Sequence, residues 1–405
     1  MRTIAMSVFA AGLAFWVGAA AAQEMGDAKR GHLLAETVCS ECHAIDKGAP
    51  RSRNGDAPTF ESGDLTKDLL KLIGSEDLCS KRWIWEQYDY MVRTNTTAGP
   101  GSDAAVVRVK EIDTSIAMAL DGNGRYCYLD PRQGAMLNVA ECCRNLATLG
   151  ALPIAATNNL NFGNPERPEV MAQIVEAIEG MAEACEFFET PITGGNVSLY
   201  NETLGEGIYP TPVLGIIGLM PTAKPVPRHF QNEGRTILLL GGLGDTDETR
   251  FGGTEYAKVV LDTLWGLPPK LDLAVEKRVH DLIRGIVAAG LAENAHDLSA
   301  GGLAVALGLS ASRSLGADVA LDSSLLPEHL LFHEAPSRIL VSTAEPDRIR
   351  KMAEEQGVPC LPIGVTMKER LQIRNRDQIL IQTTTSELHD HFESAFPKLL
   401  HPNAR

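Results

Sequence analysis

The chain has 405 residues, of which 44% are hydrophobic and 22% charged. That length and apolar content suit two or three domains with buried cores, and they exclude a disordered or collagen-like chain. The net charge of −15 argues against a nucleic-acid-binding protein, because such proteins present a basic face. Six of the eight cysteines show no paired spacing, which excludes a disulfide scaffold: Cys79, Cys127, Cys142, Cys143, Cys185 and Cys360.

The first 22 residues have the pattern of a secretory signal peptide. Arg2 is the only charged side chain before Glu24, and the apolar run that follows it ends in three alanines at 20–22. The alternative is an uncleaved membrane anchor, since the run is nearly long enough to span a bilayer. A signal peptide at 1–22 predicts export to the periplasm.

A haem-attachment motif follows. Cys39, Cys42 and His43 form C-x-x-C-H, in which both thiols bond covalent haem c and the histidine reaches the iron. A chance cysteine pair or half of a zinc site is the alternative. Residues 23–62 resemble a truncated cytochrome c start, predicted as a short helical or irregular extension, and no later segment resembles the second half of such a protein.

From residue 64 the chain becomes amphipathic and rich in turns. Residues 104–109 and 116–120 predict paired strands, and 133–149 predict a helix. Glu141 and Asn145 stand four residues apart on that helix, so both can reach one Mg²⁺. A hydrogen bond between the two side chains in solvent fits the same spacing.

The next helix is predicted over 169–187, with an apolar stripe that faces a core. A strand at 190–192 then leads into Thr193–Ser198. The glycine pair there allows backbone N–H groups to approach an anion, with Asn196 and Ser198 as polar ligands. A plain tight turn is the alternative reading of this segment.

A strand at 213–220 and a proline-containing linker at 221–232 precede a second α/β unit, which starts with a strand at 236–240. The glycines after that strand lack the dinucleotide-binding pattern. A helix over 273–289 leads to His296–Leu303. There Asp297 stands ahead of a glycine pair that opens a helix and could hold a metal near phosphate, while His296 is expected to be structural rather than a catalytic base.

Several long motifs occur in one order and carry a resemblance: Ser80–Tyr88, Thr94–Val107, Arg125–Pro131, Asn159–Pro165, Thr193–Glu202, Tyr209–Pro212 and His296–Leu303. With them, residues 64–400 resemble the C-terminal half of small-form phosphoribosylformylglycinamidine synthase, subunit II. The resemblance implies an α+β / α/β fold of the aminoimidazole ribonucleotide synthetase type. In it, a ferredoxin-like sheet domain at 64–225 precedes an α/β domain at 233–405.

The implied activity is a ligase reaction of purine biosynthesis. The family converts formylglycinamide ribonucleotide to the amidine with ATP and Mg²⁺, using ammonia from a glutaminase subunit, with a small accessory subunit. Such a role implies a cytoplasmic protein, which conflicts with export. This ligase activity is the first of three hypotheses for the chain. The second is an exported c-type haem protein for electron transfer, and the third is a non-functional fusion or artefact of two genes.

Site residues follow from the resemblance one position at a time. Ser102, Asn158, Gly195 and Ser299 match ATP-binding positions, and Ser198 a substrate contact; Asp103, Glu141, Asn145, Asn196 and Asp297 match magnesium positions. Three positions depart from the family pattern: Asn158 stands where aspartate is usual, Ala300 where an acidic residue is common, and Gly124 where proline is usual.

The family's catalytic base is the histidine of a His-Asn-His-Pro-Ser motif in the other half of the synthase. The internally related place here reads Asn123–Cys127 and contains no histidine, so no catalytic residue is assigned. The chain alone is therefore expected to be incomplete for catalysis. Its sheet domain lacks the second sheet that closes a barrel in the family, and the exposed edge predicts a homodimer.

Overall fold

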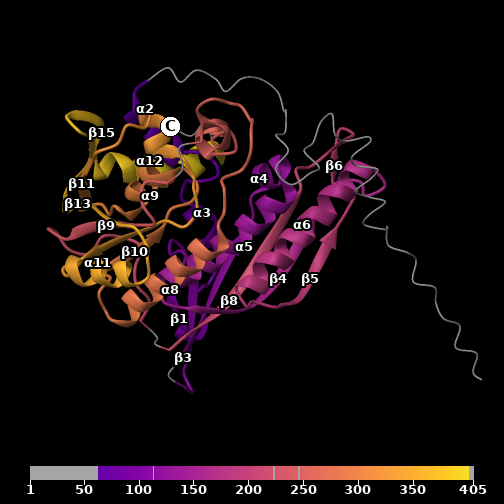
Figure 1. Cartoon of the computed structure of the whole chain (residues 1–405), viewed down its shortest axis with the longest axis horizontal. Coiled ribbons are helices and arrows are strands. Elements are labelled where there is room, and N and C mark those ends of the chain that lie inside the picture. The colour runs from indigo at the N-terminus through magenta and orange to yellow at the C-terminus, as the bar shows by residue number, and fades with distance from the viewer. Residues whose placement is uncertain (1–62, 113, 222–223, 245–246, 401–405) are drawn as a thin grey trace, which may run out of the picture.

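The computed structural model describes residues 63–400 except 113, 222–223 and 245–246. The signal-peptide, haem and cytochrome predictions at residues 1–62 lie outside these residues. In the described part, two sheet-and-helix domains lie side by side (Figure 1). None of the helices described is both long and apolar enough to cross a membrane.

The first domain is a six-stranded sheet with the order β1-β2-β3-β8-β4-β5, in which only β4 and β5 run parallel. Its strands are β1 (Thr96–Ala98), β2 (Ala105–Val109), β3 (Thr114–Asp121), β4 (Leu152–Asn161), β5 (Ile192–Ser198) and β8 (Thr211–Met220), with a small hairpin of β6 (Glu202–Thr203) and β7 (Glu206–Gly207). Its helices are η1 (Val92–Thr94), α4 (Gly124–Leu129), α5 (Pro131–Thr148) and α6 (Pro168–Phe187), whereas the short α3 (Arg82–Trp85) contacts α12 (Thr385–Leu400) of the second domain.

Helix α5 has clear local start signals. Asp130 accepts a hydrogen bond from the backbone N–H of Gln133 at 3.1 Å, and Pro131 occupies the first helical position, where it removes no intrahelical bond. Gly150, with φ of +90°, follows the helix end. These signals confirm the helix predicted over 133–149, and α6 likewise confirms the helix predicted over 169–187.

Helices α5 and α6 cover one face of the six-stranded sheet (Figure 1). Strand β3 shows the consequence, because Ala117 and Ala119 are buried beneath the helices while Met118 and Leu120 point to the other side and are exposed. One face of this sheet is therefore packed and the other is open.

The second domain is a seven-stranded mixed sheet with the order β10-β12-β9-β13-β11-β14-β15. Its strands are β9 (Thr236–Leu240), β10 (Asn294–Asp297), β11 (Leu315–Leu321), β12 (Ile339–Thr343), β13 (Cys360–Lys368), β14 (Arg370–Asn375) and β15 (Gln378–Thr384). Its helical elements are η2 (Glu248–Arg250), α7 (Glu255–Val259), α8 (Leu273–Ala288), α9 (Gly302–Ser310), α10 (Pro327–Phe332), α11 (Pro346–Glu355) and α12 (Thr385–Leu400).

Strand β9 explains the layering of this domain. Ile237 and Leu239 belong to a core shared with α9 and α12, whereas Leu238 and Leu240 belong to a core shared with α8 and α11. Because successive side chains of a strand point to opposite faces, a continuous apolar run is expected for a sheet covered on both faces. The second domain thus has three layers.

Helix α2 (Leu65–Ile73) packs against the second domain although it precedes the first in the chain. Asp64 caps its N-terminus, and Leu69, Leu72 and Ile73 are buried in the same core as α9 and α12. The domain boundaries at 64–225 and 233–405 stay a prediction, while the predicted pairing of a sheet domain with an α/β domain is confirmed.

Candidate functional site

The candidate site lies where α5 of the first domain meets β10 of the second. Asp103, in the loop before β2, is its central carboxylate. Its Oδ1 lies 2.7 Å from His296 Nδ1, and its Oδ2 accepts hydrogen bonds from the Thr148 hydroxyl at 3.1 Å and the Asp297 backbone N–H at 3.0 Å. Burial raises the pKa of Asp103, but the charges of His296 and Arg228 outweigh that effect, so its pKa lies below the usual value.

Asp297 ends β10 beside Asp103. Its Oδ2 lies 3.4 Å from Arg144 Nη2 and its Oδ1 lies 3.8 Å from His296 Nδ1. One ligand atom from each of Asp103, His296 and Asp297 falls within 4.8 Å of the others, which is close enough for a shared metal ion. The two aspartates are those that the resemblance predicts, and His296 serves as the hydrogen-bond partner of Asp103.

Asp121, at the end of β3, was missed by sequence reasoning. The amide nitrogen of Asn145 donates to both of its carboxylate oxygens, at 3.3 and 3.2 Å. This assignment turns the amide oxygen of Asn145 away from Asp121 and leaves it free to act as a ligand. Asp121 thus orients Asn145, as groups behind a metal ligand commonly do.

The carboxylates of this site outnumber the nearby positive charges. Burial raises the pKa of Asp121 to about 7, and repulsion from Asp297 adds to the rise. Burial also raises the pKa of Glu141 well above its usual range, with further repulsion from Asp121 and Asp297. Carboxyl groups that resist ionisation in one buried place are typical of functional sites, because a bound cation relieves the repulsion.

A buried network of ion pairs lies next to the site and reaches it through Arg144, which contacts Asp297. Arg144 of α5 donates to Glu276 of α8 at 2.5 Å, and His280 Nε2 lies 2.8 Å from the same Glu276 oxygen. The hydroxyl of Ser337 donates to the other oxygen. Burial opposes ionisation of Glu276, but Arg144 and His280 dominate and lower its pKa to about 2. Sequence spacing carried no signal for this network, since its members come from three separate segments.

The glycine pair at 301–302 lies beside a buried carboxylate of the chain itself. The backbone N–H of Gly301 donates to Oε1 of Glu334 at 2.6 Å, and the hydroxyl of Tyr126 donates to the other oxygen of that carboxylate. A carboxylate from the chain thus takes the N–H of Gly301, the residue just before α9. Ser299 lies just before this turn, and Ser102 adjoins Asp103.

The remaining predicted residues lie on the β4–β5 side of the sheet. Asp121, Leu214, Asn158 and Gly195 form one row across β3, β8, β4 and β5. Three strand spacings separate the ends of the row, or roughly 14 Å. Asn158 and Gly195 are therefore distinct from the cluster around Asp103.

Gly195 fits its neighbour closely, because a Cβ at this position would overlap the Asn158 side-chain oxygen. Next to it, Asn196 donates its amide to Asn159 at 2.9 Å, and Ser198 donates its hydroxyl to Asn201 at 3.2 Å. The predicted magnesium position at Asn196 thus lies with this second group, apart from the four other predicted ligands.

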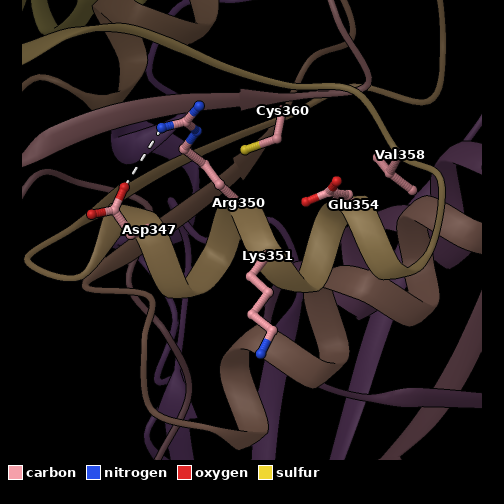
Figure 2. Close-up of a pocket in the computed structure, with 6 residues that line it drawn as sticks. All are labelled: Asp347, Arg350, Lys351, Glu354, Val358 and Cys360. Atoms are coloured by element: carbon pink, nitrogen blue, oxygen red, sulfur yellow. Dashed lines mark ion pairs between the residues drawn. The ribbon is translucent and has the colours of Figure 1, made fainter.

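A surface pocket of about 480 Å³ lies elsewhere in the second domain, against α11 and β13 (Figure 2). Its lining mixes charges of both signs, and an ion pair at 3.5 Å already joins Arg350 to Asp347. Burial raises the pKa of the Cys360 thiol there to about 11, so the thiolate is scarce at neutral pH. The pocket shares no residue with the candidate site.

Comparison with known proteins agrees with this architecture. The family model described as AIR synthase related protein, N-terminal domain, matches residues 101–220, and the corresponding C-terminal domain model matches residues 232–374. Phosphoribosylformylglycinamidine synthase subunit PurL from Moorella thermoacetica is 47% identical over 346 residues, which are 84% of this chain and 46% of that protein. The PurL subunit from a Bradyrhizobium species is 45% identical, over 82% of this chain and 45% of that protein.

Solved structures support the fold. Thermotoga maritima PurL complexed with FGAR has a TM-score of 0.65 and 21% identity, covering 82% of this chain and 54% of that one. The same protein complexed with ATP has a TM-score of 0.62 and 20% identity, and the match covers 83% of this chain and 53% of that one. The chain thus spans about half the length of the relatives that it matches. Because the two domain models together match more than half of its residues, the chain belongs to the AIR synthase related proteins, with a sequence of the PurL synthase type.

Proposed function

We propose that this chain binds ATP with Mg²⁺ as half of a synthase that converts formylglycinamide ribonucleotide to formylglycinamidine ribonucleotide. The observation that carries the proposal is the contact between Asp103 of the first domain and Asp297 of the second, with ligand atoms within 4.8 Å of each other. Asn145 lies beside Asp121 on the α5 side of this contact, and the charges of Asp121 and Asp297 act on Glu141. The sequence similarity to PurL subunits supports the reaction, and the substrate name comes from those relatives.

The residues of the cluster fit magnesium. Mg²⁺ prefers oxygen ligands, and the cluster offers three carboxylates and an amide oxygen. The hydrogen bond between Asn145 and Asp121 points that oxygen away from Asp121. Burial, and after it repulsion from neighbouring carboxylates, raises the pKa values of Asp121 and Glu141, and a divalent cation would relieve that repulsion. Bound there, Mg²⁺ would offset the negative charge of nucleotide phosphates.

Nucleotide contacts are proposed in two places. Ser102 and Ser299 flank the cluster, while Asn158, Gly195 and Asn196 lie on the β4–β5 side with the substrate position Ser198 beside them. The exposed backbone of β5 provides polar groups that a ligand could contact. Asn158 carries no charge where the family usually has aspartate, so this second place would bind a metal less tightly.

Catalysis is proposed to need more than this chain. In the place related to the family's catalytic motif, Asn123 caps α4 and the guanidinium of Arg125 donates to the backbone oxygens of Gly252 and Thr263. Both residues thus have structural roles here. We assign the remaining catalytic groups to another half of the synthase, and the supply of ammonia to glutaminase and accessory subunits. ATP and a glutaminase both favour the cytosol over the periplasm.

The open face of the first sheet supports association with a second sheet. Large apolar side chains gather on it: Met118, Leu120, Leu152, Ile217 and Leu219. In the register, Leu219 lies between Ile116 of β3 and Leu152 of β4, so the patch is continuous across strands. An apolar sheet face of this kind is typical of a buried interface. We propose that a second copy of the chain covers it when no other half is present.

Calorimetric titration with ATP tests the nucleotide proposal. The intact chain should bind ATP only when Mg²⁺ is present. Asp297→Asn should weaken that binding at least tenfold, because a carboxylate that serves as a ligand becomes a neutral amide. Glu354→Gln, in the surface pocket, removes the same charge away from the cluster and should leave binding unchanged. Equal binding with and without Mg²⁺, or an unaffected Asp297→Asn variant, would contradict the proposal.

A further inference from the structure

Arg144 occupies an unusual position in the candidate site. Its side chain comes from α5, next to Asn145, and is only 2% exposed. One end of its guanidinium contacts Glu276 of the second domain at 2.5 Å, and the other end lies 3.4 Å from Asp297 Oδ2. A single side chain of the first domain therefore touches the second domain twice.

Glu276 is a firm anchor for that guanidinium. It is fully buried, and its two oxygens are shared among Arg144, His280 and Ser337. Because these contacts fix the carboxylate, the planar guanidinium bound to it has little freedom to rotate. Glu276 also neutralises Arg144, so the arginine does not repel a cation placed near Asp297.

The two oxygens of Asp297 have different neighbours: Arg144 lies 3.4 Å from Oδ2, and His296 Nδ1 lies 3.8 Å from Oδ1, too far for a hydrogen bond. Arg144 engages Oδ2, whereas Oδ1 faces the side of His296 and Asp103. Holding one oxygen of a carboxylate fixes the direction of the other. The oxygen left free is the one that lies among the other predicted ligands.

We propose that Arg144 is a positioning residue: anchored by Glu276, it aims the carboxylate of Asp297 at the cation site and so makes that site depend on the docking of the two domains. This role rests on the proposed function, because it presumes that Asp297 binds a cation. The simpler alternative is that Arg144 and Glu276 only join the domains.

A double variant separates the two roles. Arg144→Met alone would leave the buried Glu276 charge without its partner and could unfold the chain. Arg144→Met with Glu276→Gln removes both charges and keeps one acceptor oxygen for His280, while the new amide nitrogen can donate to the Ser337 hydroxyl. Replacing both partners of a buried ion pair is commonly tolerated. Its thermal unfolding midpoint should therefore stay near that of the wild type.

The measurement is the affinity for Mn²⁺, a paramagnetic substitute for Mg²⁺ that accepts the same ligands, followed by electron paramagnetic resonance. The resonance signal of bound Mn²⁺ is assigned to this site if the signal disappears when the full chain carries Asp297→Asn. The folded double variant should bind Mn²⁺ about tenfold more weakly than the wild type or worse. A matched control is Arg235→Met with Glu293→Gln, an ion pair at 2.6 Å outside the site, which should leave the affinity unchanged.

The outcomes are distinct. A folded double variant that binds Mn²⁺ as tightly as the wild type would overturn the positioning role and leave the proposed function standing. A wild-type chain that binds no Mn²⁺ at this site would overturn the proposed function, and the role of Arg144 with it. Weaker Mn²⁺ binding at an unchanged thermal unfolding midpoint supports the proposal, because a residue pair that only joins the domains would not produce that combination.

Discussion

Asp121 illustrates how its surroundings set the chemistry of a single carboxyl group. Removal from water and the nearby charge of Asp297 raise its pKa to about 7, above the ordinary 3.8. Below pH about 7 the protonated form of Asp121 is therefore favoured in the folded chain without cation. Its contribution to the free energy of unfolding is present in acid and is lost as the pH rises through about 7.

Magnesium affinity should accordingly depend on pH. A cation beside Asp297 favours the ionised form of Asp121, so binding releases a proton at lower pH. Affinity should rise by up to about tenfold per pH unit below pH about 7 and level off above it. Calorimetric titrations at several pH values, in buffers of different ionisation enthalpy, measure the affinity and the protons released. Asp121→Asn should reduce the slope; the same slope in both proteins would contradict the prediction.

At the scale of elements, the packing of α6 against the start of α5 depends on one glycine. Gly180 of α6 is buried, and a Cβ there would overlap the backbone carbonyl oxygen of Arg132. Two ion pairs join the same two helices, because Arg132 Nη1 lies 2.5 Å from Glu179 Oε2 and Arg132 Nη2 lies 2.5 Å from Glu183 Oε2. Since a backbone oxygen cannot move aside without shifting its helix, Gly180 sets the distance between the two helices.

Gly180→Ala should therefore lower the free energy of unfolding by about 1–3 kcal/mol, the usual cost of overpacking. Gly285→Ala in α8 is the matched control, since its Cβ would meet only the flexible Met352 side chain at 3.3 Å. There the better helix propensity of alanine should stabilise the chain by up to about 1 kcal/mol. Urea unfolding measures the free energy of unfolding of both variants. Equal effects of the two substitutions would count against this packing argument.

For the whole molecule, the open face of the first sheet is an apolar surface without a partner in the described part of the chain. Leu120 is 76% exposed and Leu219 is 42% exposed on it. Burial of apolar side chains contributes about 25 cal/mol per Å², so a continuous patch favours association with a complementary sheet. The β5 edge, exposed along its length, adds unpaired backbone groups on the same domain.

The chain should consequently form a homodimer that Leu219→Glu dissociates, because the substitution places a charge in the centre of the patch. Ile178→Glu is the control, since Ile178 is 45% exposed on the outer side of α6 and lies outside this face. Sedimentation velocity at several concentrations distinguishes the two variants. A wild-type monomer, or dissociation by both substitutions alike, would show that this face is not the interface.

Local features of the sequence were sufficient for much of the fold. The helix predicted over 133–149 is present as Pro131–Thr148, with Asp130 and Pro131 marking a start two residues earlier than predicted, and the strand predicted at 236–240 is a continuous apolar run. The predictions at residues 1–62 are untested by the described residues, and the carried-over roles of the site residues stay predictions. From spacing alone, Glu141 and Asn145 could either bind one metal ion together or form a hydrogen bond with each other. In the structure, the amide of Asn145 donates to Asp121.

What the sequence by itself determined is the type and order of several elements, among them the helices α5 and α6 and the strand β9, together with the resemblance to a synthase half. The magnesium-binding residues that the resemblance implies stay predictions. Only the tertiary structure revealed that Arg144 joins Glu276 to Asp297, that Asp121 orients Asn145, and that Glu334 accepts the backbone N–H of Gly301. The physical reason is distance along the chain. Caps and apolar periods act within a few residues, whereas these contacts join residues from 24 to 153 positions apart, which only strand pairing and domain docking bring together.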